Sequence, residues 1–331
     1  MSTTVAVTGA DGFIGSHLVE ALVAEGYLVR AMAQYNSFAS AGWLDELSPE
    51  VLANVDVRFG DVRDLSSVTS LCTGADMVCH LAALIAIPYS YEAPGSYIQT
   101  NVVGTHNVLE AARALGTGRV VCTSTSEVYG TARSVPISES HPLQAQSPYA
   151  ASKIAADKLA ESYHLSFGLP VITLRPFNTF GPRQSARAVI PTVIAQLAAG
   201  HRQIALGSLD PTRDFNYVKD TAQAFVSALR GPAEEMIGGT YNAGSGREIS
   251  IAETVELIAE VMGLDVEVVL DPQRLRPEGS EVMRLISDSS ALRAATAWKP
   301  AHTLEAALSA TAEWFNDKRN LARYKPDVYN V

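Results

Sequence analysis

Short runs of β-branched and apolar residues alternate along the first half of the chain with longer segments in which apolar residues recur every three or four positions. Short apolar runs are typical of buried strands, and the longer spacing is typical of amphipathic helices. Strands that alternate with helices form a parallel sheet covered by helices on both faces. The sequence therefore predicts an α/β fold with a doubly wound parallel sheet, including strands at residues 5–8, 29–33, 55–59, 77–81, 119–124 and 171–175.

The pattern changes after about Pro176, where prolines divide the chain into shorter elements. Proline has no amide donor, so it interrupts helices and inner strands. We interpret this part as a smaller α/β substrate lobe that is partly interleaved with the first domain. The expected division gives residues 1–175 and about 212–240 to the first domain, and residues 176–211 and 241–331 to the second lobe.

Composition narrows the range of partners. The chain of 331 residues carries a net charge of −10, so we expect no binding to nucleic acid or to anionic membranes, which requires an excess of Lys and Arg. The sequence has neither a signal peptide pattern nor an uncharged apolar stretch of 18 residues, and we expect a cytoplasmic protein. Cys72, Cys79 and Cys122 lack metal-ligand spacing, so we expect three reduced, packed thiols and no metal.

A glycine-rich turn joins the first predicted strand to a predicted helix at residues 16–24. It reads Gly9-Ala10-Asp11-Gly12-Phe13-Ile14-Gly15, with the strand before it and the helix after it that dinucleotide binding requires. Gly9 would permit the tight turn, Gly12 would let a pyrophosphate approach the backbone, and Gly15 would allow close packing of the helix. The turn predicts a Rossmann-type nucleotide site formed by Gly9, Asp11, Gly12, Phe13, Ile14 and Gly15.

The residues that select the cofactor give a weaker signal. An acidic residue after the second strand favours NAD, whereas an Arg there favours the 2′-phosphate of NADP. The stretch reads Ala33-Gln34-Tyr35-Asn36-Ser37 and offers neither. We expect NAD, with NADP as the open alternative. Asp61, after the third strand, either binds the adenine amino group or caps the next helix.

Tyr149 and Lys153 begin an amphipathic segment that continues to Tyr163. At positions i and i+4 of a helix they share one face. A phenol titrates at about 10, so it is a poor base at neutral pH unless nearby positive charge favours the phenolate. Lys153 supplies such a charge and can also hold the nicotinamide ribose. A Tyr-x-x-x-Lys pair arises by chance in many helices, but together with the glycine turn it predicts a dehydrogenase-type proton relay.

Another set of candidate residues, Thr125, Ser126 and Glu127, follows the fifth predicted strand. Thr125 can relay a proton between a substrate hydroxyl and Tyr149. Hydride transfer at one carbon has no use for Glu127, because the tyrosine alone handles that proton. A carboxylate beside the nicotinamide therefore indicates a second proton transfer, at carbon. The structural alternative is that Glu127 caps a loop or pairs with an Arg.

These motifs resemble, over nearly the whole chain, those of the extended short-chain dehydrogenase/reductases that modify nucleotide sugars. The Thr-Ser-Glu triplet at residues 125–127 is similar to that of the 4,6-dehydratases, including the GDP-mannose enzyme. Residues 35–38, 87–91 and 181–187 most resemble the dehydratases of legionaminic-acid-type pathways. The other segments that carry the resemblance are residues 9–15, 80–83, 101–105, 147–153, 175–182 and 213–218.

The resemblance implies roles for further residues. It adds Asn36, Ser37, Val62, Leu81, Ala82 and Ala83 to the expected cofactor site. It implies that Asn178 contacts the sugar diphosphate and that Arg213 and Arg276 bind its phosphates, a task that suits the planar guanidinium. From the residues alone, Asn178 fits equally well as a turn residue and Arg276 as a solvated surface charge. The dTDP-glucose dehydratases have Asp where this chain has Ser126, which leaves Glu127 as the carrier of both protons and Ser126 to orient the leaving oxygen.

The reaction implied by the resemblance has three steps. Hydride leaves C4 of the hexose while Tyr149 takes the O4 proton, Glu127 removes the C5 proton while water leaves C6, and the hydride returns to C6. The product would be a 4-keto-6-deoxy sugar nucleotide, and the cofactor would stay tightly bound because each turnover regenerates it. The resemblance also suggests a homodimer built on helices containing residues 101–114 and 151–163.

Several alternatives stay open at this stage. A 4-epimerase has the same fold, and so does a uronate decarboxylase, some of which also carry Thr-Ser-Glu before Val-Tyr-Gly. Against the decarboxylase, Tyr149 is followed here by Ala-Ala-Ser-Lys, whereas those enzymes look different in that stretch. A non-catalytic NAD(P)-sensing protein is the alternative from another class, and the intact Thr125, Tyr149 and Lys153 count against it. The sequence does not name the nucleotide base or the substituent at C2.

Overall fold

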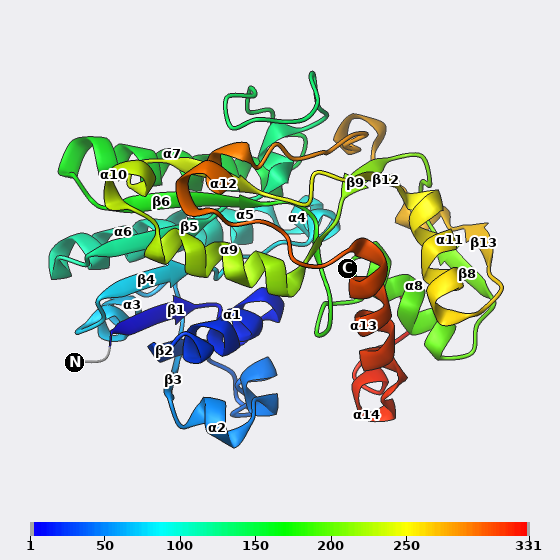
Figure 1. Ribbon diagram of the computed structural model, residues 1–331, viewed down its shortest axis with the longest axis horizontal. Helices are drawn as coiled ribbons and strands as arrows, with labels where there is room; N and C mark the ends of the chain where they lie inside the picture. The colour runs from blue at the N-terminus through cyan, green and yellow to red at the C-terminus, as the bar shows by residue number, and fades with distance from the viewer. Residues whose placement is uncertain (1–2, 330–331) are drawn as a thin grey trace.

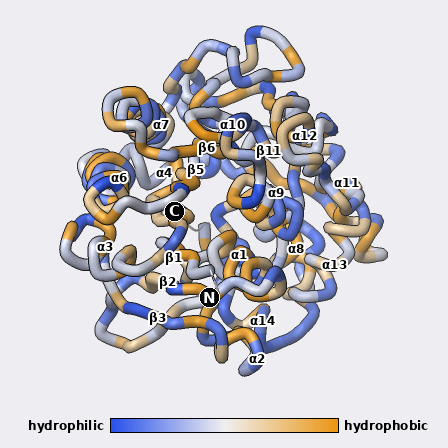
Figure 2. Tube along the Cα trace, turned by 60° about the vertical axis from the view of Figure 1, so that its left-hand side comes forward, coloured by the Kyte–Doolittle hydropathy of each residue, from blue (hydrophilic) through white to orange (hydrophobic). Residues whose placement is uncertain are grey.

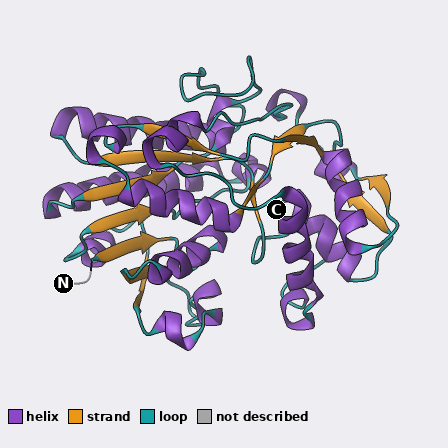
Figure 3. Ribbon diagram, viewed as in Figure 1, coloured by secondary structure: helices purple, strands orange, loops and turns teal. Residues whose placement is uncertain are grey.

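A seven-stranded parallel sheet forms the centre of the computed structural model, which describes residues 3–329 (Figures 1 and 3). The strand order is β11-β6-β5-β4-β1-β2-β3. Each of the six predicted strands is present, and no end differs from the prediction by more than one residue. The strands are β1 (Thr4–Thr8), β2 (Leu28–Gln34), β3 (Val55–Gly60), β4 (Met77–His80), β5 (Arg119–Thr123), β6 (Val171–Pro176) and β11 (Thr240–Ala243).

Helices cover both faces of the sheet, as the doubly wound prediction requires. One face carries α1 (Phe13–Ala24), α9 (Val218–Arg230) and α12 (Ser290–Thr296). The other face carries α3 (Leu65–Cys72), α6 (Gly104–Leu115) and α7 (Pro148–Phe167). Figure 2 shows the apolar strands enclosed by helices that alternate between apolar and polar residues. The apolar stripe of each helix therefore determines which of its sides lies on the sheet.

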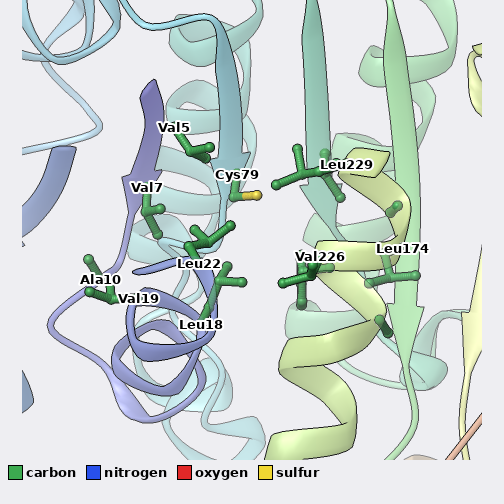
Figure 4. Packing of buried hydrophobic residues seen from close by; sticks show 14 of the residues in the cluster. Val5, Val7, Ala10, Leu18, Val19, Leu22, Cys79, Leu174, Val226 and Leu229 are labelled. Carbon is green, nitrogen blue, oxygen red and sulfur yellow. The ribbon is translucent and has the colours of Figure 1, made fainter. Parts of the chain in front are cut away.

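The packing of α1 and α9 against the sheet is shown in Figure 4. Leu18 and Leu22 of α1 lie beside Cys79 of β4, and Val226 of α9 approaches them from the side of Leu174. Leu18 and Leu22 are completely buried, and burial of a leucine side chain contributes about 1.5–3 kcal/mol of transfer free energy. This layer holds the first turn of α1 at the edge of the sheet.

The three cysteines are free and buried, which confirms the prediction of packed, unpaired thiols. Cys79 and Cys122 lie on neighbouring strands of the sheet, and Cys72 lies on α3. Burial raises the pKa of the Cys72 thiol to about 11. Burial also raises the pKa of Cys122 to about 12 and that of Cys79 further, so all three thiols stay protonated at neutral pH.

A smaller lobe lies beside the sheet with its own apolar core (Figure 1). Helix α11 begins with a capping box, in which Ser250 and Glu253 bond each other's backbone amides. The elements of the lobe are α8 (Val189–Ala198), α11 (Ile251–Met262), α13 (Leu304–Asn316) and α14 (Lys318–Leu321), with the strand pairs β7 (Thr179–Phe180) and β10 (Asn216–Tyr217), β9 (Thr212–Asp214) and β12 (Glu248–Ser250), and β8 (Gln203–Leu206) and β13 (Glu267–Leu270).

The expected boundary near residue 240 needs a correction. It falls inside β11, whose residues Tyr241 to Ala243 pair with β6 in the main sheet and not with any strand of the smaller lobe. Further along the chain, Leu292 and Trp298 also pack into the core around α1 and α9. The chain thus returns to the main sheet twice after β6, because the edge of β6 and the apolar face of α9 both need a partner.

His80 ties together three elements at the centre of the sheet. Its Nδ1 lies 2.8 Å from Thr8 Oγ1 on β1, and its Nε2 lies 2.9 Å from Thr105 Oγ1 on α6. Burial, with a smaller contribution from the charge of Lys153, lowers the pKa of His80 to about 3. The imidazole is therefore neutral in the folded protein across the physiological range.

The depressed pKa of His80 predicts a pH-dependent stability. An unfolded histidine titrates at about 6.5, so between that pH and about 3 the unfolded chain binds one more proton than the folded chain. The stabilisation is complete above pH 6.5 and is lost as the pH falls, by about 1.4 kcal/mol per pH unit from this residue.

We expect urea unfolding at about pH 6 and pH 5 to show this additional slope in the wild type and not in His80→Gln. The difference between the two proteins isolates His80 from the carboxylates, which titrate in both. Parallel slopes for the two proteins would contradict the assignment.

Candidate functional site

A cleft of about 1230 Å³ runs between the carboxyl edge of the sheet and the smaller lobe. The strand order reverses between β4 and β1, and open α/β sheets bind ligands at such a reversal. The residues after β1, β4 and β5 all line the cleft. Nineteen of the twenty-one residues proposed from the sequence line it, and the two exceptions are Asn36 and Ser37.

The glycine turn has the geometry that its spacing predicts. Gly9 has a φ of +67°, and a Cβ at this position would lie 2.7 Å from the amide nitrogen of Ala82. A Cβ at Gly15 would lie 2.0 Å from the carbonyl oxygen of Gly9. Both positions therefore exclude any side chain. The first turn of α1 has no side-chain cap at Gly12, so its amides face the cleft and can bind an anion.

The loop after β2 differs from the prediction. The side chain of Asn36 bonds the backbone of its own loop, donating to Gln34 O and Ser40 O and accepting from the Phe38 and Ser40 amides. Asn36 and Ser37 do not line the cleft, and their contact with the cofactor stays a prediction. Gln34, Ser40 and Trp43 line the cleft in their place. The Asx-type turn satisfies the hydrogen-bonding groups of the Asn36 side chain within its own loop.

Two carboxylates near the glycine turn accept hydrogen bonds from other residues of the protein. Asp11 accepts a hydrogen bond from the Gln34 amide at 3.0 Å, and burial raises its pKa. Asp61 accepts from Arg63, whose hydrogen bond lowers the Asp61 pKa. The cap of α3 is Asp64, so Asp61 does not serve as that cap. Asp61 and Val62 both line the cleft, where Asp61 is placed as a paired carboxylate.

Tyr149 and Lys153 lie on one face of α7, in its first turns. Ser147 caps the helix by accepting from the Ala150 amide, and Pro148 occupies the first helical position. Both side chains are buried. The Lys153 ammonium donates to the Thr123 carbonyl oxygen at 2.5 Å. The capping residues Ser147 and Pro148 thus determine where α7 begins, and the hydrogen bond to Thr123 places Lys153 at the end of β5.

The surroundings of Tyr149 make the phenol a weaker acid than in water. Burial raises its pKa, the hydrogen bond with Thr125 lowers it, and the charge of Glu127 raises it again. Tyr97 packs edge-on against the ring at 6.2 Å. Burial also lowers the pKa of Lys153, while Asp157 one turn further along raises it. The protein alone therefore favours the protonated phenol.

The Thr125–Ser126–Glu127 triplet forms the start of a short 3₁₀ helix, Ser126–Tyr129. Thr125 Oγ1 accepts from the Glu127 amide at 3.2 Å, which fixes the backbone of the triplet. The Glu127 side chain is 8% exposed and lines the cleft. Within residues 3–329 no Lys, Arg or His forms an ion pair with it, although its charge raises the pKa of Arg213.

The residues expected to bind phosphate meet at the other end of the triplet. Arg213 is buried and donates to Val282 O at 2.7 Å and to Glu281 Oε1 at 3.1 Å. Arg276 Nη1 lies 3.6 Å from the same carboxylate oxygen. Burial lowers the pKa of Arg213, and the Glu127 charge opposes this. Asn178 Oδ1 is buried without a partner in the described chain. Two guanidiniums thus meet at one carboxylate, and an unpaired amide lines the same cleft.

The charge of the cleft opposes that of the whole protein. Its walls carry nine Lys or Arg residues and four Asp or Glu residues, whereas the chain has a net charge of −10. A cleft lined by one sign of charge concentrates ligands of the other sign. The site is therefore suited to an anionic ligand such as a diphosphate.

Sequence reasoning missed several residues of the cleft. Thr123 Oγ1 and Ser124 Oγ are buried beside Lys153 without a hydrogen-bond partner in the described chain. Glu281 joins Arg213 to Arg276, and Trp43 forms part of the wall near the glycine turn. The Thr-Ser-Thr-Ser run was a visible signal for Ser124. Nothing local marked Glu281 or Trp43, because each acts through a sequence-distant contact.

These observations fit a dinucleotide. The Gly9–Gly15 turn leaves room for a pyrophosphate at the N-terminus of α1, and the unpartnered Thr123 and Ser124 hydroxyls offer hydrogen bonds near Lys153. Tyr149 and Lys153 lie where a nicotinamide ring and its ribose would meet a substrate. No helix within residues 3–329 has the length and apolar character needed to cross a membrane.

Comparisons with known proteins extend over nearly the whole chain. A family model described as GDP-mannose 4,6 dehydratase matches residues 6–311. A dTDP-glucose 4,6-dehydratase of Xanthomonas campestris pv. campestris is 34% identical over 337 residues, covering 93% of this chain and 92% of that protein. A UDP-glucose 4-epimerase of Mycolicibacterium smegmatis is also 34% identical, over 319 residues, covering 94% of this chain and 98% of that protein.

A solved structure has the same fold over nearly its whole length. The crystal structure of DesIV, a dTDP-glucose 4,6-dehydratase from Streptomyces venezuelae with NAD and TYD bound, superimposes with a TM-score of 0.85 at 31% identity. The match covers 98% of this chain and 99% of that chain. Identity alone does not separate a dehydratase from an epimerase, so the residues of the cleft must decide between them.

Proposed function

Since the chain belongs to the GDP-mannose 4,6-dehydratase family, we propose that it is an NAD-dependent nucleotide-sugar 4,6-dehydratase, which converts an NDP-hexose or NDP-N-acetylhexosamine to the 4-keto-6-deoxy sugar nucleotide. One observation carries the proposal. The carboxylate of Glu127 lines the same cleft as Tyr149, its charge raises the pKa of that tyrosine, and no cation of the described chain forms an ion pair with it. Dehydration needs such a second proton-transfer group, and epimerisation at C4 does not.

The residues divide the reaction between them. The glycine turn and Lys153 would hold NAD, which would supply the reversible hydride transfer between C4 and C6. Tyr149 takes the proton of O4, with Thr125 as the hydrogen-bonded relay. Glu127 then removes the C5 proton, which the C4 ketone acidifies, and gives it to the hydroxyl that leaves C6 as water. When the hydride adds to C6, C5 takes up a proton that comes from solvent through Glu127, and the O4 proton passes from Tyr149 to solvent. Ser126, buried at the start of the 3₁₀ helix, orients the leaving oxygen.

The pKa of Tyr149 limits when this step can occur. Burial and the Glu127 charge keep the phenol protonated in the protein alone. Two positive charges, the Lys153 ammonium and the oxidised nicotinamide ring, would favour the phenolate. Proton abstraction from O4 is thereby confined to the state in which the oxidised cofactor is in place. Asp157, held by Arg175 at 2.9 Å, offsets part of the fall that burial causes in the pKa of Lys153.

The diphosphate of the substrate would bind at Arg213 and Arg276, with Asn178 beside it. Planar guanidiniums match phosphate oxygens in pairs of hydrogen bonds. The Glu281 carboxylate now holds both arginines at one point. This position places the hexose between the phosphate site and Tyr149, next to Glu127.

A 4-epimerase is the second candidate, favoured by the 34% identity to the UDP-glucose 4-epimerase. Its chemistry is confined to C4, so a free carboxylate beside the nicotinamide would have no function there. A non-catalytic NAD(P)-binding protein is less well supported, since Thr125, Tyr149 and Lys153 are assembled in one cleft.

We also propose that the enzyme acts as a cytoplasmic homodimer. The supporting features are apolar side chains exposed at the ends of α6 and α7, namely Leu115, Leu165 and Phe167. These helices lie side by side on one face of the sheet (Figure 1), and a second copy would cover them. The free cysteines are typical of a reducing compartment.

Purified protein is expected to carry tightly bound NAD, because a hydride that is returned in every turnover gains nothing from release of the cofactor. Denaturation followed by chromatography of the released nucleotide identifies it. NAD is expected over NADP, since the stretch 33–37 offers no cation for a 2′-phosphate. Protein that is purified empty and is active only with added NADPH would reverse this prediction.

Tyr149→Phe is expected to lower the rate of C4 oxidation by about 10²- to 10⁴-fold while leaving substrate binding intact, since only the proton-transferring hydroxyl is removed. Tyr163→Phe removes a hydroxyl from the same helix outside the cleft and is the matched control. Single-turnover measurement of dihydronicotinamide absorbance reports the step. Near-normal oxidation by Tyr149→Phe would show that another group takes the O4 proton.

Glu127→Gln separates the dehydratase from the epimerase. The amide keeps the size of the side chain but loses the base, so hydride should still leave C4 while water is retained. The variant is expected to accumulate reduced cofactor and 4-keto sugar, and solvent deuterium should enter C5 in the wild type and not in the variant. Mass spectrometry over a panel of UDP-, GDP-, CDP- and dTDP-sugars measures both effects.

The exposed loop variant Glu278→Gln is the control for loss of a carboxylate. An epimerase would incorporate no deuterium at C5 in either protein and would leave the mass of the substrate unchanged. Dehydration by Glu127→Gln at the wild-type rate would remove this carboxylate from the mechanism.

A further inference from the structure

The segment after α14 returns from the smaller lobe to the cleft. Its residues Arg323, Tyr324, Lys325 and Tyr329 all line the cleft, although they lie far along the chain from the glycine turn and from Tyr149. Figure 1 shows this last part of the chain, in red, between the main sheet and the β8–β13 pair. We call residues 323–329 the strap.

The beginning of the strap is fixed to two walls of the cleft. Tyr324 donates its hydroxyl proton to Gln184 O at 2.9 Å, and its ring packs against Phe315 with centroids 4.7 Å apart. The Arg323 guanidinium lies 5.1 Å from the centre of the Trp43 ring and pairs with Glu46. Trp43 belongs to the loop that lies against Asp11 in the glycine turn. The strap therefore touches both the cofactor loop and the smaller lobe.

The end of the strap lies at the opposite end of the cleft. Tyr329 packs its ring against the Arg274 guanidinium at 4.8 Å. Arg274 is held by Asp271, and its carbonyl oxygen lies so close to Gly207 that a Cβ there would be 2.6 Å away. Gly207 and Arg274 follow the paired strands β8 and β13, so this wall is a rigid part of the smaller lobe.

The order of the sites along the cleft indicates what this wall contacts. In the proposed function, the glycine turn and Tyr149 bind the cofactor, Glu127 faces the hexose, and Arg213 with Arg276 binds the diphosphate. The remaining part of a nucleotide sugar is its nucleoside, which must extend beyond Arg276. The neighbouring residues that line the cleft there include Gly207, Arg274 and Tyr329.

We propose that the strap completes the nucleotide-sugar site, with Tyr329 packing against the nucleoside and Lys325 meeting the diphosphate. This inference rests on the proposed function only for the class of ligand. Tyr329 offers an aromatic face already aligned by Arg274, and stacking on such a face is tolerant of the base. Lys325 carries an exposed ammonium, and within residues 3–329 no carboxylate forms an ion pair with it.

The test is binding of nucleoside diphosphates to the protein as purified, measured by titration calorimetry with UDP, GDP, CDP and dTDP. Tyr329→Ala is expected to weaken the best-bound nucleotide about tenfold, the loss of one aromatic contact with a base. Tyr329→Phe keeps the ring and should bind like the wild type. Lys325→Ala should weaken the diphosphate more than the corresponding nucleoside, whereas Lys318→Ala, an exposed lysine outside the cleft, should weaken neither.

The result that overturns the proposal is binding of all four nucleotides by Tyr329→Ala and Lys325→Ala with wild-type affinity. Faster binding and faster release with an unchanged Kd would also overturn it, since the strap would then be a lid without a contact. Absence of nucleotide binding in the wild type would refute it as well. The readout is independent of dehydration: a protein that binds nucleotide through the strap but releases no water would refute the proposed function alone.

Discussion

Contact between the β1–α1 turn and the residues after β4 is the constraint on which the cleft depends. Gly9 lies so close to the backbone of Ala82, and Gly15 so close to Gly9, that neither position accepts a Cβ. This contact brings the N-terminus of α1 to the point where the strand order reverses. Because parallel strands end at one edge of the sheet, the residues that follow β4 and β5 are delivered to the same place.

Burial at this edge has opposite consequences for the groups that react. It raises the pKa of Tyr149 and lowers that of Lys153, so neither side chain is charged as readily as in water. The charge of Asp157, which is paired with Arg175, offsets part of this effect at Lys153. The reactivity of the tyrosine is consequently controlled by charges that enter the cleft with the ligands. A site of this kind is inactive until it is filled.

The smaller lobe contributes positive charge to the cleft. Its arginines converge on a cleft in an otherwise acidic protein, and Glu281 holds two of them together against their mutual repulsion. The strap joins this lobe to the cofactor loop through Arg323 and Trp43. The two halves of the cleft are thus linked both at the sheet edge and across its opening, and a ligand that spans them meets groups from sequence-distant segments.

Local patterns in the sequence determined the six predicted strands, the glycine turn and the Tyr149–Lys153 pair. Each depends on a short-range rule: the β-branched run of a strand, the steric need for glycine, or the four-residue spacing of a helix face. These rules act over a few residues and can be read without knowing the fold.

Only the tertiary structure decided the rest. Strand β11 is short and contains polar Thr240 and Asn242, so its place beside β6 depends on the free edge of that strand and not on its own pattern. The Asn36 side chain bonds the backbone of its own loop and does not line the cleft, whereas Trp43 does. Glu281 and Tyr329 gained their positions from contacts with residues far away in the chain. A contact between distant segments leaves no periodic signal in either one, because its energy depends on where the remainder of the chain has placed them.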